Sequence, residues 1–215
     1  ELIELAKKHN IILMVGHIER FNPAVLKLKE IIDSGKLGEI VIISSKRAGV
    51  FPSQIKDANV MIDLAVHDID IVSHLFNKQP DDVTLNSGKA LIDSRDDHAE
   101  LLLKFGSQTG IVQVNWITPI PIRALTLTGT KGYAELNYMT KELTIYESTY
   151  NKTIDSIGEQ TIKFEPTTKE NIPVEKNDQL RTELSNFLSC IHANCAPYVT
   201  GQCGYNALKI ALNKN

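Results

Sequence analysis

Short alternating segments separated by turn residues fill the stretch from residue 82 to residue 147, and they limit the fold more than any other feature. In each segment apolar or β-branched residues alternate with polar ones, a pattern typical of strands. The connections "FGSQTG" and "TGTKG" are typical of tight hairpins, so neighbouring strands should run antiparallel. The predicted strands are 82–90, 98–105, 110–117, 123–128, 132–138 and 142–147.

Helices are predicted before and after these strands. Asn22 fits an N-cap, Pro23 the first turn and Gly35 the end of one helix, and a buried strand follows at 39–45. The polar segment 148–160 is predicted to be a loop. Further elements are predicted as a strand at 161–164 and helices near 177–192 and 203–213.

This order of elements predicts an α+β domain, a large open and mostly antiparallel sheet with helices on one face. The alternating segments leave apolar or aromatic residues on both faces of the sheet. An apolar face that no helix covers needs a partner. We therefore expect a homo-oligomer that forms through the sheet.

The first 18 residues follow a different pattern. The segment "ELIELAKKHNIILMVGH" predicts a helix at 1–9 followed at once by an apolar strand at 11–15. A helix that leads into a fully apolar strand is typical of a parallel, doubly wound sheet, and one such unit cannot bury itself alone. We expect residues 1–18 to be the end of a preceding domain and residues 19–215 to form the α+β domain.

Composition excludes several classes of function. The net charge is -3 and no run of Lys or Arg occurs, so the chain has no basic surface for nucleic acid. No apolar stretch approaches the roughly 20 residues that span a bilayer, and the start does not resemble a signal peptide. The three cysteines lack the close pairs of a zinc or redox site. We expect a cytoplasmic protein that binds neither nucleic acid nor membrane.

The segment "NVMIDLAVHDIDIVSHLF" places Asp63, His67, Asp70 and His74 at steps of four, three and four residues, which predicts one stripe on a helix. A carboxylate one turn before a histidine can orient it and make it more basic, which suits removal of a hydroxyl proton near neutral pH. A plain surface ion pair is one alternative. Another is a metal-dependent hydrolase, but Asp63 and His74 lie too far apart to share an ion.

Two motifs together resemble a known family. The pair "VGHIERFNPAV" and "NVMIDLAVHDIDIV", the second with the pattern D-x-x-x-H-x-x-D, is similar to the Gfo/Idh/MocA family of NAD(P)-dependent sugar oxidoreductases. The resemblance implies a Rossmann domain, of which residues 1–18 would be the remnant. It also implies a following domain of the dihydrodipicolinate-reductase type, whose open sheet forms oligomer contacts. Within the family the sequences of these motifs are most similar to those of UDP-N-acetylglucosamine 3-dehydrogenases and related MviM-like virulence-factor proteins.

The resemblance also implies roles for single residues. His67 would be the acid/base at the sugar hydroxyl, and Asp63 would orient it or contact the substrate. Arg20 and Asn22 would lie where nicotinamide and sugar meet, and Arg20 would contact both. Arg47, expected at the end of its strand, is a candidate for binding the sugar or its phosphate. No metal site is implied.

The implied reaction moves a hydride between a sugar or sugar-nucleotide hydroxyl and NAD or NADP. For the subgroup the oxidised position would be C3 of UDP-N-acetylglucosamine. The chain departs from the family in two motifs, because no G-x-G-x-x-G occurs among its 12 glycines and no Lys-Pro supplies the usual catalytic lysine. We expect the chain by itself to be inactive and not to bind the cofactor. A non-catalytic oligomerisation or ligand-binding module is the alternative.

Overall fold

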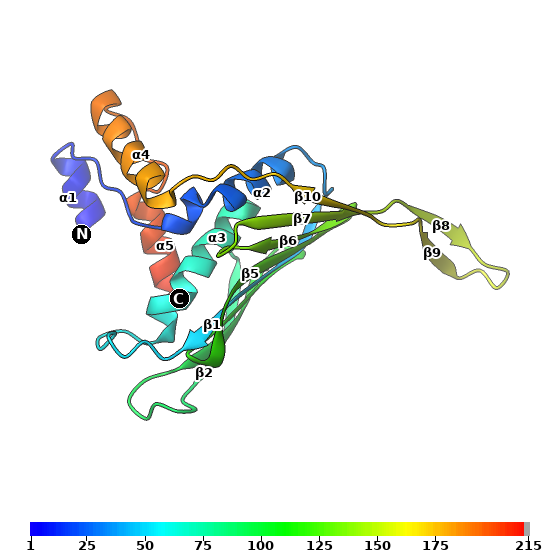
Figure 1. Cartoon of the computed structure of the whole chain (residues 1–215), viewed down its shortest axis with the longest axis horizontal. Coiled ribbons are helices and arrows are strands. Elements are labelled where there is room, and N and C mark those ends of the chain that lie inside the picture. The colour runs from blue at the N-terminus through cyan, green and yellow to red at the C-terminus, as the bar shows by residue number, and fades with distance from the viewer. Residues whose placement is uncertain (213–215) are drawn as a thin grey trace.

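The computed structural model describes residues 1–212, in which a layer of helices covers one side of a large curved sheet (Figure 1). The sheet has eight strands in the order β10-β7-β6-β5-β1-β4-β3-β2, and all neighbours are antiparallel except β1 and β4. Its strands are β1 (Ile40–Val50), β2 (Asp82–Gly88), β3 (His98–Phe105), β4 (Gln108–Asn115), β5 (Ile117–Gly129), β6 (Gly132–Asn137), β7 (Glu142–Glu147) and β10 (Thr168–Ile172). The predicted α+β class and open sheet are confirmed.

The helical segments precede, interrupt and follow the strands. They are α1 (Leu2–Lys8), the 3-10 turn η1 (Ile18–Phe21), α2 (Pro23–Asp33), the π-helical turn η2 (Met61–Ala65), α3 (Val66–Phe76), α4 (Gln179–Ala193) and α5 (Gly201–Ala211). Asn22 caps α2 as predicted, because its Oδ1 accepts a hydrogen bond from the Ala24 amide at 3.1 Å. No helix within residues 1–212 is both long enough and apolar enough to cross a bilayer.

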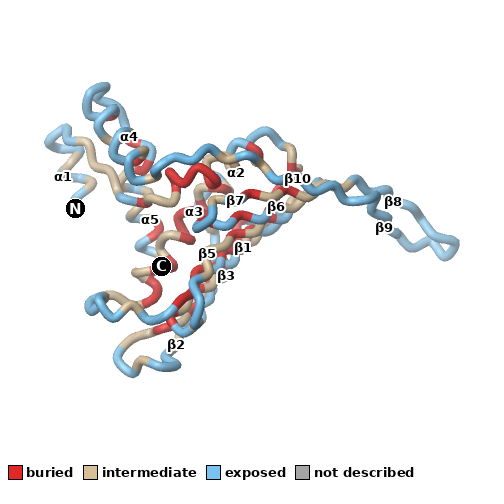
Figure 2. Tube along the Cα trace, in the orientation of Figure 1, coloured by how far each residue is buried: buried red, intermediate tan, exposed pale blue. Residues whose placement is uncertain are grey.

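The core lies between the sheet and helices α2, α3 and α5, where Figure 2 shows the buried residues gathered. Alternation along the strands produces this arrangement, because Leu101 and Leu103 are buried while Leu102 between them is exposed. Helix α3 approaches the sheet closely at Gly110, where a Cβ would lie 2.6 Å from Val72 Cγ1. This close approach holds α3, which carries His67, Asp70 and His74, against the sheet.

A second, two-stranded sheet projects from the end of the main one (Figure 1). Its strands β8 (Tyr150–Ile154) and β9 (Gln160–Phe164) pair antiparallel, and every residue in both is exposed. Part of this hairpin falls in the segment predicted to be a loop. The prediction of a loop at 148–160 is therefore wrong for β8.

Other expectations also differ from the structure. Strand β5 begins at Ile117 and not at residue 123, and β4 covers Gln108–Asn115 in place of 110–117. Residues 11–15 are not a strand, because the one sheet contact of this segment is an isolated bridge between Met14 and Thr200. Strand β1 extends to Val50, beyond the predicted end at residue 45, since β4 and β5 pair with it on both sides. Strand β10 was not predicted. The end of the last predicted helix, Asn213, lies outside the described residues.

Candidate active site

The helical segment that carries Asp63, His67, Asp70 and His74 begins with a wide turn. Asp63 belongs to the π-helical turn η2, and the regular helix α3 starts at Val66. A π-turn holds more residues than an α-turn, so Asp63 does not follow the direction of the later side chains. His67, Asp70 and His74 share the face that meets residues 17–20 and Tyr198. The expected stripe is therefore formed by three of the four side chains.

His67 is half-buried and lies edge-on to His17, with ring centroids 6.2 Å apart and an interplanar angle of 86°. Nδ1 of His67 and Nε2 of His17 are buried, and neither has a hydrogen-bond partner among the described residues. Burial lowers the pKa of both imidazoles below 6.5, and the positive charge of Arg47 lowers that of His67 further. Both rings are therefore neutral at pH 7. His67 thus lies next to a residue that directly follows the first 16 residues of the chain.

Asp63 makes a different contact from the predicted one. Its carboxylate accepts a hydrogen bond from Nε1 of the buried Trp116 at 2.9 Å. The guanidinium of Arg95 lies 5.5 Å from the centre of the Trp116 ring, so the indole is held from both sides. Within residues 1–212 no hydrogen bond joins Asp63 to His67. The orienting role predicted for Asp63 stays a prediction without a contact that carries it.

Arg20 and Asp70 form a buried, two-pronged ion pair. Nε and Nη2 of Arg20 donate to the two carboxylate oxygens of Asp70, each at 2.7 Å. On the same face of the helix, Nε2 of His74 lies 3.0 Å from the Tyr198 hydroxyl. Burial lowers the pKa of His74 to about 4. Asp70 and His74 are therefore both bonded to partners within the protein.

Arg47 lies inside β1 and is almost fully buried, whereas the sequence placed it at the end of a strand. It donates to the Asp68 carboxylate at 2.9 and 3.2 Å and to Glu19 at 3.1 Å. Asn22 is fully buried, and its amide is bonded within the protein. The partners of Arg20, Asn22 and Arg47 are thus internal, and substrate binding by these residues stays a prediction.

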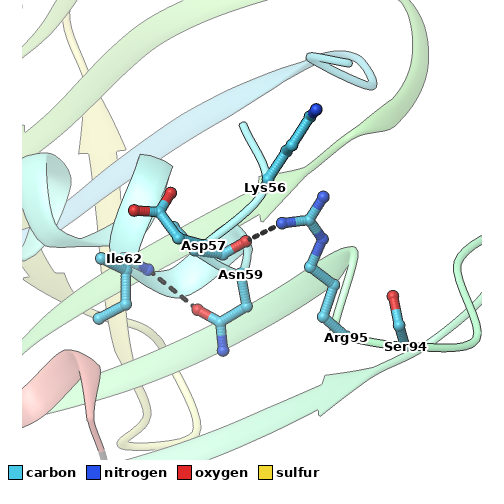
Figure 3. A pocket seen from close by; sticks show the side chains of 7 residues that line it. Lys56, Asp57, Asn59, Ile62, Ser94 and Arg95 are labelled. Atoms are coloured by element: carbon cyan, nitrogen blue, oxygen red, sulfur yellow. Dashed lines mark hydrogen bonds between the residues drawn. The ribbon is translucent and has the colours of Figure 1, made fainter. Parts of the chain in front are cut away.

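A cavity of about 570 Å³ opens beside the start of the same helix (Figure 3). Its lining includes two cations, Lys56 and Arg95, and one carboxylate, Asp57. Arg95 donates hydrogen bonds to the carbonyls of Ala58 at 2.7 Å and Ile55 at 2.6 Å, which fixes the loop before the helix. The cavity could accept a polar or anionic group near the π-turn that carries Asp63.

Sequence reasoning missed His17. The residue stands in the quoted motif "VGHIERFNPAV", directly after the apolar run, and its position in that motif was the available signal. The spacing argument considered one helix only, so it could not find a partner 50 residues away. Within residues 1–212 no group of three His, Cys, Asp or Glu side chains is arranged to hold a metal ion.

Comparison with known proteins identifies relatives of the chain. The profile described as the GFO/IDH/MocA C-terminal domain matches residues 25–135. A UDP-N-acetylglucosamine 3-dehydrogenase of Acidithiobacillus ferrooxidans is 24% identical over 212 residues, which cover 98% of this chain and 64% of that protein. A scyllo-inositol 2-dehydrogenase (NAD(+)) of Bacillus subtilis is also 24% identical over 212 residues, covering 92% of this chain and 57% of the relative.

Solved structures show the same fold. The Acidithiobacillus ferrooxidans UDP-N-acetylglucosamine 3-dehydrogenase superposes with a TM-score of 0.81 at 23% identity, over 99% of this chain and 64% of that one. An aldose-aldose oxidoreductase of Caulobacter crescentus superposes with a TM-score of 0.77 at 17% identity, over 99% and 63%. The chain therefore spans less than two thirds of the length of these relatives.

Proposed function

The chain belongs to the Gfo/Idh/MocA family, and we propose that it forms the substrate-binding and acid/base half of an NAD- or NADP-dependent sugar oxidoreductase. The observation that carries the proposal is the state of His67. This imidazole is half-buried and neutral at pH 7, and it lies against His17 beside residues 1–15. A neutral imidazole in such a place is suited to accept a proton from a bound hydroxyl.

In the proposed reaction a sugar carbon that bears a hydroxyl becomes a ketone. A bound nicotinamide would supply the hydride acceptor. Nε2 of His67 takes the hydroxyl proton, because Nδ1 is the buried nitrogen. The charge of Arg47 disfavours the protonated ring, so His67 gives the proton up again readily.

The residues present fit the reacting end of a nicotinamide cofactor and not its phosphates. The imidazoles of His17 and His67 are neutral, and the nearby guanidinium groups of Arg20 and Arg47 are already paired with carboxylates. The 215 residues hold no G-x-G-x-x-G motif. We therefore propose that phosphate binding belongs to a Rossmann domain, to which residues 1–18, with helix α1, also belong.

The surface of α4 supports this division into domains. Leu180, Leu184, Leu188 and Ile191 recur at helical spacing, and each is about half exposed. A stripe of this kind on one helix is typical of a surface that another domain covers. We propose that the rest of the Rossmann domain packs against it.

We propose a nucleotide sugar as substrate, with C3 of UDP-N-acetylglucosamine as the oxidised position. Two observations support this choice: the named relative acts on that compound, and Lys56 and Arg95 place positive charge in the cavity beside the helix. Purified complete protein, incubated with UDP-sugars, free sugars and inositols in turn, should reduce NAD or NADP fastest with UDP-N-acetylglucosamine. Faster reduction with a free inositol would contradict the choice of substrate, and no reduction with any compound would contradict the proposed function.

We propose that the open face of the sheet joins copies of this chain. No helix within residues 1–212 covers this face (Figure 1), and Leu102 and Ile111, which are 49% and 37% exposed, lie opposite each other on strands β3 and β4. The variant Leu102→Lys/Ile111→Lys should elute as a smaller particle with a lower mass in light scattering, because two buried charges would oppose association. The control is Leu91→Lys, at an exposed position outside the strands, which should leave the mass unchanged. A single-chain mass for the unmodified protein would contradict the proposal.

A further inference from the structure

His17 and His67 present a matched pair of unsatisfied atoms. Nε2 of His17 and Nδ1 of His67 are both buried without a partner in the described part of the chain, and the two rings meet edge to face. A buried polar nitrogen without a hydrogen bond costs about 1–3 kcal/mol. One water that bridged these two nitrogens would satisfy both, since each neutral ring offers either a donor or an acceptor.

A carboxylate lies close to the same nitrogen of His17. Oδ1 of Asp70 lies 3.8 Å from Nε2 of His17, and Arg20 fixes that carboxylate with two hydrogen bonds. Asp63, in contrast, is bonded to Trp116. A chain of groups that can orient His67 and carry its proton therefore runs through His17 to Asp70.

We propose that His17 is the positioning residue of His67, that a buried water links His67 Nδ1 to His17 Nε2, and that the water passes the proton on. This inference rests on the proposed function of His67 as the base. His67 carries its proton on Nδ1, so Nε2 is free to accept the hydroxyl proton. The Nδ1 proton moves to the water, and the water gives one of its own to His17 Nε2. Asp70 stabilises the resulting imidazolium, which then releases its Nδ1 proton to solvent, so one proton leaves for each hydroxyl oxidised. Both rings return to the Nδ1-protonated tautomer by proton exchange with water before the next turnover.

The charged and titratable groups around the pair fit this direction of transfer. Burial keeps His17 neutral, and therefore able to accept a proton, while Asp70 favours its charged form. The positive charge of Arg47 disfavours protonated His67. The charged groups that act on the two rings are Arg47 from β1, Asp68 and Asp70 from α3, and Glu19 and Arg20 from η1. From α4, the Glu183 carboxylate lies near Gly16, 3.5 Å from where a Cβ would stand.

The tautomer of His67 tests the proposal without any substrate. In the complete protein labelled with ¹⁵N-histidine, long-range ¹H–¹⁵N spectra should show the proton of His67 on Nδ1. The variant His17→Phe fills the space but cannot bind the water, so it should lose this preference, whereas His17→Gln keeps a hydrogen-bonding oxygen and should retain it. A proton on Nε2 in the unmodified protein, or an unchanged tautomer in His17→Phe, would overturn the proposal.

Kinetics give the second readout. His17→Phe should lower kcat about tenfold, at the lower end of what a proton-transfer group contributes, with KM unchanged and with a smaller loss in His17→Gln. An unchanged kcat in His17→Phe would overturn the relay. A fall in kcat with an unchanged tautomer would assign His17 a packing role and overturn it as well. If His67→Ala itself keeps full kcat, the proposed function fails, and the tautomer still reports on the pair.

Discussion

Replacing His67 with alanine in the complete protein is expected to lower kcat by a factor of about 10² to 10⁴, the usual contribution of a general base. Cofactor affinity should stay the same, because His67 is proposed to act on the sugar hydroxyl and not to bind the cofactor phosphates. Steady-state kinetics with the preferred sugar give kcat, and a fluorescence titration with the reduced cofactor gives the affinity.

The pH profile of the unmodified protein adds an independent check on the same residue. The base must be neutral to act, so activity should fall as the pH drops through its pKa. Burial and Arg47 hold the pKa of His67 below 6.5, so the midpoint of this fall should lie below pH 6.5. A midpoint above that value would indicate another base.

The matched control is His74→Gln, on the same face of α3. His74 bonds to the Tyr198 hydroxyl, and a glutamine can replace that hydrogen bond. Its kcat should remain within about twofold of the unmodified protein, since even a lost hydrogen bond of about 1 kcal/mol would act on the helix and not on the reaction. Equal losses in His67→Ala and His74→Gln would show that the helix, and not the base, had been disturbed.

The main sheet was predictable where local pattern decides the structure. The boundaries predicted for β3 and β7 match the structure, because each segment is short, rich in apolar residues and bounded by turn residues. Gly106, with its φ of 66°, makes the predicted turn of the β3–β4 hairpin. The length of β1 was not predictable in this way, since pairing with the distant β4 and β5 extends it past a polar stretch.

Elements that depend on partners or on sparse patterns were missed. Strands β8 and β10 carry mostly exposed residues, so they lack the apolar pattern that predicts a strand. Residues 11–15 form an apolar run that does predict a strand, yet a strand forms only where another strand supplies hydrogen bonds. Periodicity reports which side chains are apolar and says nothing about which neighbours are present.

The site was only partly predictable for a similar reason. Spacing selected His67 and Asp70 correctly as neighbours on one face, but it assumed regular α-helix and so included Asp63, which the π-turn turns toward Trp116. The contact between His17 and His67 joins residues 50 positions apart. No periodicity within one helix can reveal such a contact.

Replacing Asp68 with alanine is expected to destabilise the domain by about 3–5 kcal/mol, the typical cost of breaking a buried ion pair from one side. Asp68 is fully buried and accepts hydrogen bonds from Ser45 and from two nitrogens of Arg47. Without it, the charge of Arg47 stays buried with Glu19 as its remaining carboxylate partner. Urea unfolding followed by circular dichroism gives the free energy of unfolding.

Two further variants separate the buried charge from lost packing. The double variant Arg47→Met/Asp68→Leu removes both charges and keeps apolar volume, so it should be less destabilised than Asp68→Ala, because no uncompensated charge remains. Glu30→Ala breaks an exposed ion pair with Lys27, in which the side chain of Glu30 is 66% exposed and that of Lys27 is 43% exposed. This variant should lower the free energy of unfolding by less than about 1 kcal/mol. If Asp68→Ala costs no more than Glu30→Ala, the pair between β1 and α3 does not hold this helix to the sheet, and the position of His67 must depend on packing alone.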